Sequence, residues 1–197
     1  MTRVFQAAPA AAAIFLGLAA AAASAQTADG LSTGKDIVDG VEVGKTYTRE
    51  TYGDWQMRCV RTQDKKDPCQ LYQLLQDEQG NPVAEISVFN ISGGGQAVAG
   101  ATVATPLETL LTEQLTMTID NSLSKRYPFS FCTSKGCYVR IGLTEEGLAA
   151  FKRGSEGTIS IVPLATPDTR VSVRMSLKGF TKGYAAVEAS NTALEQN

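Results

Sequence analysis

The residues of this chain whose type and spacing most directly imply a chemistry are its four cysteines, Cys59, Cys69, Cys132 and Cys137. An even number of cysteines in an exported chain is typical of disulfide bonds, and the first residues of this chain carry an export signal, described below. Four cysteines allow three pairings, and their spacing favours the local one, Cys59–Cys69 with Cys132–Cys137. Each bond would stabilise the fold by roughly 2–3 kcal/mol through the entropy of the unfolded chain.

Two other uses of cysteine fit this spacing less well. Zinc sites built from four cysteines usually contain Cys-x-x-Cys pairs, which are absent here, and an oxidising compartment disfavours free thiolates. A catalytic redox pair would also have the Cys-x-x-Cys spacing, within a thioredoxin-like βαβ pattern. We therefore predict structural disulfides, no metal ligands and no cofactor.

The chain contains no histidine. A Ser-His-Asp or Cys-His nucleophile therefore cannot be assembled, and the commonest ligand of catalytic zinc is missing. General acid–base chemistry would fall to Asp, Glu, Lys or Tyr side chains whose pKa values are shifted by burial.

Short motifs that resemble those of enzymes lack their partner motifs. Ser-x-x-Lys occurs twice, at residues 32–35 and 122–125, without the Ser-Asp-Asn and Lys-Thr-Gly motifs of penicillin-binding enzymes. Asp54 and Asp120 would form a carboxylate pair only if the fold brought them together. We predict a non-enzymatic protein, and a histidine-free hydrolase is the less favoured alternative.

Residues 1–25 have the features of a signal peptide. Arg3 precedes an apolar, alanine-rich stretch, and Ala23-Ser24-Ala25 is the small-x-small pattern that signal peptidase cleaves. A transmembrane anchor is the alternative, but Pro9 and the small residues before the cleavage site disfavour it. We predict cleavage near Ala25 and a mature chain without a membrane span, located in the periplasm, at the outer membrane or in the medium.

The composition fits one globular domain. Of 197 residues, 43% are hydrophobic and 19% are charged, so the chain can bury one core. The formal net charge of −2 offers no concentrated basic face, and nucleic acid is therefore not an expected partner. Peripheral association with a membrane remains open.

The hydrophobic pattern favours strands. Residues 26–49 are polar and are expected to form a flexible lead-in. Beyond it, short runs alternate between apolar and polar residues, as at 55–60, 83–89, 115–119 and 170–177. One short helix is predicted near 144–153. Thr144 can cap its first turn, glutamates lie near its beginning and basic residues near its end, and Gly154 follows as a typical helix-ending residue. The chain is thus predicted to be all-β, a single β-sandwich of antiparallel strands over residues 50–187, with a C-terminal tail at 188–197.

Five short motifs occur in order along this domain, around the four cysteines. They are Tyr-Gly-Asp-Trp-Gln-Met-Arg-Cys at 52–59, the strand beginning at Cys69, Pro106-Leu107 leading to Ile119-Asp120, Pro128-Phe129 leading to Cys137, and Ser-Leu-Lys-Gly-Phe at 176–180. This order resembles the invasion-associated locus B family of exported bacterial proteins. The resemblance implies a periplasmic or outer-membrane-associated protein, linked in pathogens to invasion of host cells, and it brings no catalytic residues.

Trp55 is expected to fill the core near the first disulfide, with its indole N–H hydrogen-bonded nearby. The functional alternative is an exposed aromatic surface formed by Tyr52, Trp55, Tyr127 and Tyr138.

We therefore predict a cell-envelope protein that acts through protein or surface contacts, with an unidentified envelope or host-surface protein as its partner. The alternative is a periplasmic domain that binds a small ligand in a pocket at the end of the sandwich. A flat apolar or aromatic patch would favour the first function, and an open pocket with a perturbed carboxylate would favour a hydrolase.

Overall fold

The structure is a computed structural model that describes residues 32–93, 95–120 and 123–196. The predicted signal peptide lies outside the described residues. The chain divides between Gly34 and Lys35 into two units, and the fold described below belongs to the second. Among the described residues, no helix is both long and apolar enough to cross a membrane.

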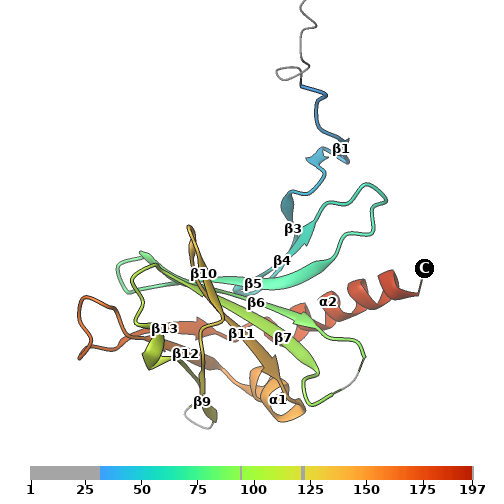
Figure 1. The fold of residues 1–197 in the computed structure, drawn as a ribbon. Coiled ribbons are helices and arrows are strands. Elements are labelled where there is room, and N and C mark those ends of the chain that lie inside the picture. The colour runs from blue at the N-terminus through green and yellow to red at the C-terminus, as the bar shows by residue number, and fades with distance from the viewer. Residues whose placement is uncertain (1–31, 94, 121–122, 197) are drawn as a thin grey trace, which may run out of the picture. The chain divides into compact units, whose positions relative to one another are not determined.

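Two large antiparallel sheets make up most of the second unit (Figure 1). The larger sheet has the strand order β10-β11-β7-β6-β5-β4-β3. Its strands are β3 (Thr46–Tyr52), β4 (Trp55–Val60), β5 (Cys69–Gln76), β6 (Pro82–Asn90), β7 (Ala99–Thr105), β10 (Phe131–Thr133) and β11 (Gly136–Leu143). The smaller sheet has the order β13-β12-β8-β9 and consists of β8 (Leu115–Ile119), β9 (Leu123–Tyr127), β12 (Glu156–Ile161) and β13 (Val171–Ser176).

Three short elements lie outside these sheets or between their strands. Strands β1 (Ile37–Val38) and β2 (Val41–Glu42) form a small hairpin, and residues Leu111–Glu113 form a 3₁₀ turn before β8. Strand β3 begins at Thr46, so it includes the last four residues of the segment that was expected to be a flexible lead-in.

The strands follow the alternation seen in the sequence. In β4, Trp55, Met57 and Cys59 are buried while the residues between them are not, and β8 has the same pattern. The buried side chains of both sheets pack into one hydrophobic core. The predicted antiparallel β-sandwich is therefore confirmed.

Helix α1 (Glu145–Arg153) is the predicted one. The Thr144 hydroxyl accepts a hydrogen bond from the backbone N–H of Gly147 at 3.2 Å, which caps the first turn. A Cβ atom on Gly154 would lie 2.9 Å from the carbonyl oxygen of Ala150, which explains the glycine at the end of the helix.

A second helix, α2 (Phe180–Glu195), corrects the prediction of a single helix. It includes residues 188–195 of the expected C-terminal tail. The sequence gives a weak signal because Gly183, serine, threonine and asparagine have low helix propensity. Tertiary packing compensates, since Phe180, Tyr184 and Val187 are fully buried.

An aromatic cluster joins the two helices to the core. The Trp55 and Phe180 rings meet edge to face at 5.2 Å, and Phe180 also contacts Phe151 and Tyr184. The Trp55 indole N–H donates to the carbonyl oxygen of Ser176 at 2.8 Å. The predicted core position of Trp55 is confirmed.

Both disulfides have the predicted local pairing. Cys59–Cys69 joins two residues that lie opposite each other on β4 and β5, and Cys132–Cys137 does the same on β10 and β11. The second bond holds the three-residue strand β10 against β11.

Candidate functional site

The four aromatic residues that were proposed as one exposed surface do not form one. Tyr52 and Trp55 are 8% and 0% exposed, because they lie on the core side of β3 and β4. Tyr127 and Tyr138 are half-buried and belong to different sheets. Of the four, only Tyr138 takes part in the apolar surface described next.

One row of paired residues crosses the outer face of the seven-stranded sheet. In register, it runs Phe131, Tyr138, Ala104, Glu85, Leu74, from β10 to β5. Phe131 is 50% exposed and its ring stacks on that of Tyr138 at 5.0 Å. Leu74, at the other end of the row, is 43% exposed. The row therefore presents large apolar side chains to solvent at both ends.

Two shallow hollows extend this row toward the smaller sheet. The first has a volume of about 280 Å³, and Leu74, Val83, Pro106 and Tyr138 contribute to its walls. The second, about 240 Å³, shares Val83 and Pro106 with it and adds Leu107. We call this surface the apolar band: Leu74, Val83, Pro106, Leu107, Phe131 and Tyr138. Two charged residues, Glu85 in the row and Lys135 in the wall of the first hollow, lie among them.

Sequence reasoning missed the apolar band because its members come from separate strands and loops. Leu107 is 49% exposed, yet one exposed leucine in a sequence is unremarkable. Only the strand register places Phe131 and Leu74 in the same row.

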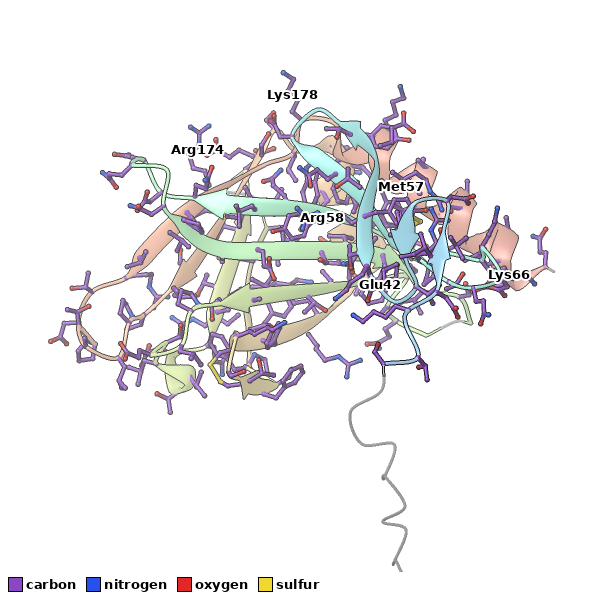
Figure 2. The ribbon with its side chains drawn as sticks, turned by 90° about the horizontal axis from the view of Figure 1, so that it is seen from above. Glu42, Met57, Arg58, Lys66, Arg174 and Lys178 are labelled. Atoms are coloured by element: carbon purple, nitrogen blue, oxygen red, sulfur yellow. A yellow bond between two sulfur atoms is a disulfide. The ribbon has the colours of Figure 1, made fainter. Side chains whose placement is uncertain are left out.

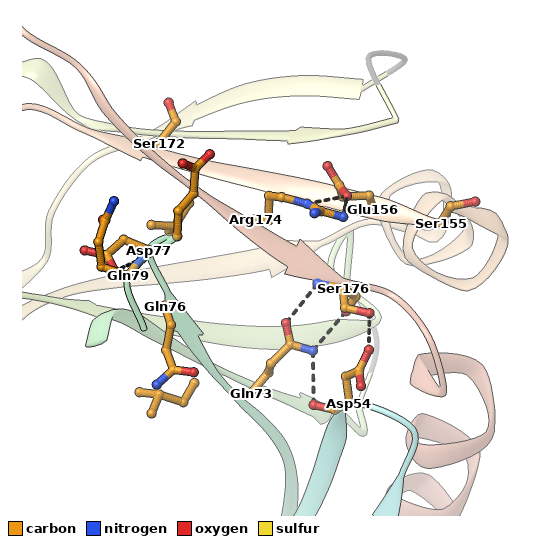
Figure 3. A pocket seen from close by; sticks show the side chains of 13 residues that line it. Asp54, Gln73, Gln76, Asp77, Gln79, Ser155, Glu156, Ser172, Arg174 and Ser176 are labelled. Carbon is orange, nitrogen blue, oxygen red and sulfur yellow. Dashed lines mark hydrogen bonds and ion pairs between the residues drawn. The ribbon is translucent and has the colours of Figure 1, made fainter. Parts of the chain in front are cut away.

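A polar cleft of about 580 Å³ lies between β13 and the end of the β5–β6 hairpin (Figure 3). At its inner end, Gln73 joins three segments. Its amide accepts from the N–H of Ser176 and donates to the carbonyl oxygens of Ser176 and Asp54, at 3.0, 3.0 and 3.2 Å. The Asp54 carboxylate in turn accepts from the Ser176 hydroxyl at 2.6 Å.

Charged side chains surround the open part of the cleft. Arg174 extends outward from β13 (Figure 2). It forms an ion pair with Glu156 (Figure 3). Across the cleft, Asp77 accepts hydrogen bonds from the side-chain amide and the backbone N–H of Asn81 at 2.9 and 2.8 Å. These bonds lower the pKa of Asp77, so its carboxylate stays ionised.

The pKa values of the described carboxyl groups bear on the hydrolase alternative. A general acid at neutral pH needs a carboxyl group with a raised pKa. The carboxyl groups with shifted pKa values in the described residues, Glu42, Asp64, Asp67 and Asp77, are all shifted downward.

The two carboxylates that sequence reasoning paired line different hollows, which share Glu156. Asp54 lines the polar cleft, whereas Asp120 lines a smaller hollow and accepts the backbone N–H groups of Ser155 and Glu156, both at 2.9 Å. Ser122, from one of the Ser-x-x-Lys runs, lies outside the described residues. Among the described residues, no cluster of three or more potential ligands could hold a metal ion.

A buried ion pair stabilises the loop beside the first disulfide. Arg61 and Asp67 lie 2.9 Å apart, and the Asp67 side chain is 1% exposed. Burial alone would raise the pKa of Asp67, but hydrogen bonds from Tyr47 and Thr62, with the positive charge of Arg61, together lower it. We assign this pair a structural role, because Asp67 lies two residues before Cys69, where β5 begins.

Comparisons with known proteins agree with these features. The model of the family described as invasion associated locus B (IalB) protein matches residues 55–188. Two curated relatives, both invasion protein B homologs of Brucella abortus (strain 2308, and biovar 1 strain 9-941), are 25% identical over 146 residues. Each match covers 74% of this chain and 82% of the relative.

A solved structure has the same fold. The crystal structure of invasion associated protein B from Bartonella henselae is similar with a TM-score of 0.61 and 20% identity. The similarity covers 75% of this chain and 98% of the Bartonella chain.

Proposed function

Because the chain belongs to the invasion associated locus B family, we propose that it is an exported cell-envelope protein that acts by binding a protein partner rather than by catalysis. The partner would be a protein of the bacterial envelope or of a host-cell surface. The curated relatives are named as invasion protein homologs, which supports the second of these settings.

Export into an oxidising compartment is supported by the cysteines. All four are paired in two disulfides, and such bonds persist in the periplasm and outside the cell. The predicted signal peptide, residues 1–25, points to the same location.

The apolar band is the observation that carries the proposal. Proteins that act alone seldom expose contiguous apolar surface, and such patches commonly mark binding sites for other proteins. Aromatic side chains are frequent among the residues that dominate binding energy, and the stacked pair of Phe131 and Tyr138 offers this kind of anchor. The Cys132–Cys137 bond holds this pair in place, so little entropy would be lost when a partner binds.

Photo-crosslinking in the living bacterium tests the proposal. A photoreactive phenylalanine analogue would replace Leu107 in the apolar band, or Ile91 as the control. Ile91 is 40% exposed and follows the end of β6 opposite to Val83. We expect a discrete crosslinked protein from position 107, absent from position 91 and lost when Phe131→Asp is added. Equal crosslinking from both positions, or crosslinks that survive Phe131→Asp, would show that the band is not the binding site.

A further inference from the structure

Strand β13 has one unpaired edge, and that edge faces the polar cleft. It pairs with β12 on its other side only. The N–H of Leu177 donates to the carbonyl oxygen of Ser155, so odd-numbered residues of this segment bond toward β12. In an antiparallel pair, the intervening residues point their backbone groups the other way. The N–H and C=O groups of Ser172, Arg174 and Ser176 therefore point toward the cleft.

Strand β5 offers a second unpaired edge across the cleft. β4 begins at Trp55, and the last residue of β5 that pairs with it is Tyr72. The N–H of Val60 donates to the carbonyl oxygen of Pro68, so even-numbered residues of β5 bond toward β4. The backbone groups of Leu74 therefore point to the side where β4 has ended, and Leu74 lines the cleft.

The Gln73 amide already occupies one position of the β13 edge as a neighbouring strand would. It accepts from the N–H of Ser176 and donates to its C=O, both at 3.0 Å. Further along the same edge, the backbone N–H and C=O groups of Arg174 and Ser172 point toward the cleft. None of the described residues forms a hydrogen bond with them. The backbone groups of Arg174 and Ser172 are thus arranged as an added strand would need them. Pairing with such a strand would end at Ser176, because Gln73 already bonds to its backbone.

Two of the other three edges of these sheets carry features that discourage pairing, whereas the third, β9, is a five-residue strand in continuous register with β8. β3 has a register shift between Thr48 and Glu50, and β10 is only three residues long. Bulges and very short strands are common means of blocking edge-to-edge association. β13 has six residues and a continuous register with β12, and it therefore lacks both of these protections.

The charged side chains that line the cleft indicate which kind of peptide it would bind. Four carboxylates line it, from Asp54, Asp77, Glu78 and Glu156, against the single guanidinium of Arg174. That guanidinium is already paired with Glu156. The remaining negative potential favours lysine or arginine side chains in whatever binds.

We infer that the polar cleft binds an extended, basic segment of another protein, which adds as a strand to the free edge of β13 at Ser172 and Arg174. Main-chain hydrogen bonds supply the affinity in this mode of recognition, and side chains supply the specificity. The site adjoins the apolar band at Leu74. The substitutions that test the two sites lie elsewhere, at Arg174 for the cleft and at Leu107 and Phe131 for the band, so each site can be tested without the other.

Selection from phage-displayed random nine-residue peptides, on the mature protein with intact disulfides at low salt, provides the probe. Two substitutions at one position separate backbone from side-chain effects. Arg174→Ala removes the guanidinium but keeps the outward N–H, whereas Arg174→Pro removes both, and proline is tolerated at an edge where the N–H is not used by the ladder. We expect enriched peptides rich in Lys or Arg that bind Arg174→Ala at least as well as the wild type. Arg174→Pro should weaken binding by roughly tenfold or more, as expected for a lost and blocked backbone hydrogen bond.

Circular dichroism and a thermal melt would show whether Arg174→Pro folds. If it does not, a measurement on the unmodified protein tests whether the peptide binds as an added strand. N-methylation of alternate residues of an enriched peptide removes the donors along one of its edges. We expect one alternating set of methyl groups to abolish binding and the other set to be tolerated better. Three outcomes would overturn the inference: no enrichment of peptides, equal affinity of a folded Arg174→Pro and Arg174→Ala, or equal tolerance of both methylated sets.

Discussion

The side chain of Gln73 pairs with the backbone of Ser176, 103 residues later in the chain, through two hydrogen bonds of 3.0 Å. The same device recurs at Cys69, where the Asn191 amide accepts from the backbone N–H and donates to the C=O, both at 2.9 Å. In each case a side-chain amide replaces the peptide group of a missing strand. The first of these pairs joins the two sheets, and the second joins α2 to β5.

Replacement of Gln73 by methionine should destabilise the fold. The side chain is nearly the same size, but the partly buried N–H of Ser176 would lose its acceptor, at a cost of about 1–3 kcal/mol. Urea unfolding followed by tryptophan fluorescence would measure this change. Gln76→Met is the matched control, because Gln76 is exposed and its side chain donates to the carbonyl oxygen of Gly80, four residues away. An equal loss of stability in both variants would contradict the assigned role of Gln73.

Reduction of both disulfides should lower the melting temperature by several degrees. Each closes a short loop, of sequence separation 10 and 5, and contributes about 2–3 kcal/mol in the chain-entropy model. Differential scanning calorimetry of the oxidised protein and of a reduced, alkylated sample would test this. An unchanged melting curve would show that the bonds do not stabilise the fold.

Acid should destabilise the protein through Asp67. Its pKa in the folded protein is below its usual value of 3.8, so folding favours the ionised form. The stabilisation is therefore present above about pH 4 and is lost as the pH falls through the folded-state pKa. Asp67→Asn should cost about 3 kcal/mol at pH 7, because it removes the buried carboxylate that lies 2.9 Å from Arg61 and leaves that guanidinium the more exposed Asp39, at 3.5 Å. It should also flatten the stability curve at acid pH.

Asp64→Asn is the control for this prediction. Asp64 lies in the same loop and also has a lowered pKa, but it is fully exposed. Chemical denaturation between pH 2 and pH 7 should therefore show little difference between this variant and the wild type. The role of Asp67 would be refuted if its variant had the same pH profile as that of Asp64.

Removal of the Tyr184 hydroxyl should stabilise the fold. The residue is fully buried, and its hydroxyl has no hydrogen-bond partner within the described part of the chain. Burial, followed by the charges of Glu188 and Glu145, raises its pKa to about 12. Tyr184→Phe should raise the free energy of unfolding by about 1 kcal/mol, since an unsatisfied polar group is removed.

Tyr72→Phe provides the opposite case, because the Tyr72 hydroxyl donates to Glu85 at 2.9 Å. That substitution should lower the melting temperature, while Tyr184→Phe raises it. A lower melting temperature for Tyr184→Phe would mean that its hydroxyl has a partner in solution.

Local patterns in the sequence predicted several of the strands, the first helix and the disulfides, but not β3, β7 or β9. Alternation in β4 and β8 predicted one buried face because side chains of a strand point alternately to its two sides. Thr144 and the charges that follow it predicted α1, and short separations predicted the pairing of the cysteines. Five motifs in order were sufficient to suggest the family, which the match over residues 55–188 confirmed.

Tertiary structure alone decided where these elements meet. Helix α2 is weak in local propensity and is held by contacts of Phe180, Tyr184 and Val187 with distant strands. Phe131 and Leu74 share a row only through the register of five strands, and Gln73 reaches Ser176 only because the two sheets are close at that point. Periodicity reports whether a residue is buried, but not which residue lies opposite it. Both candidate surfaces depend on such pairings between distant residues, which is why neither could be located from the sequence.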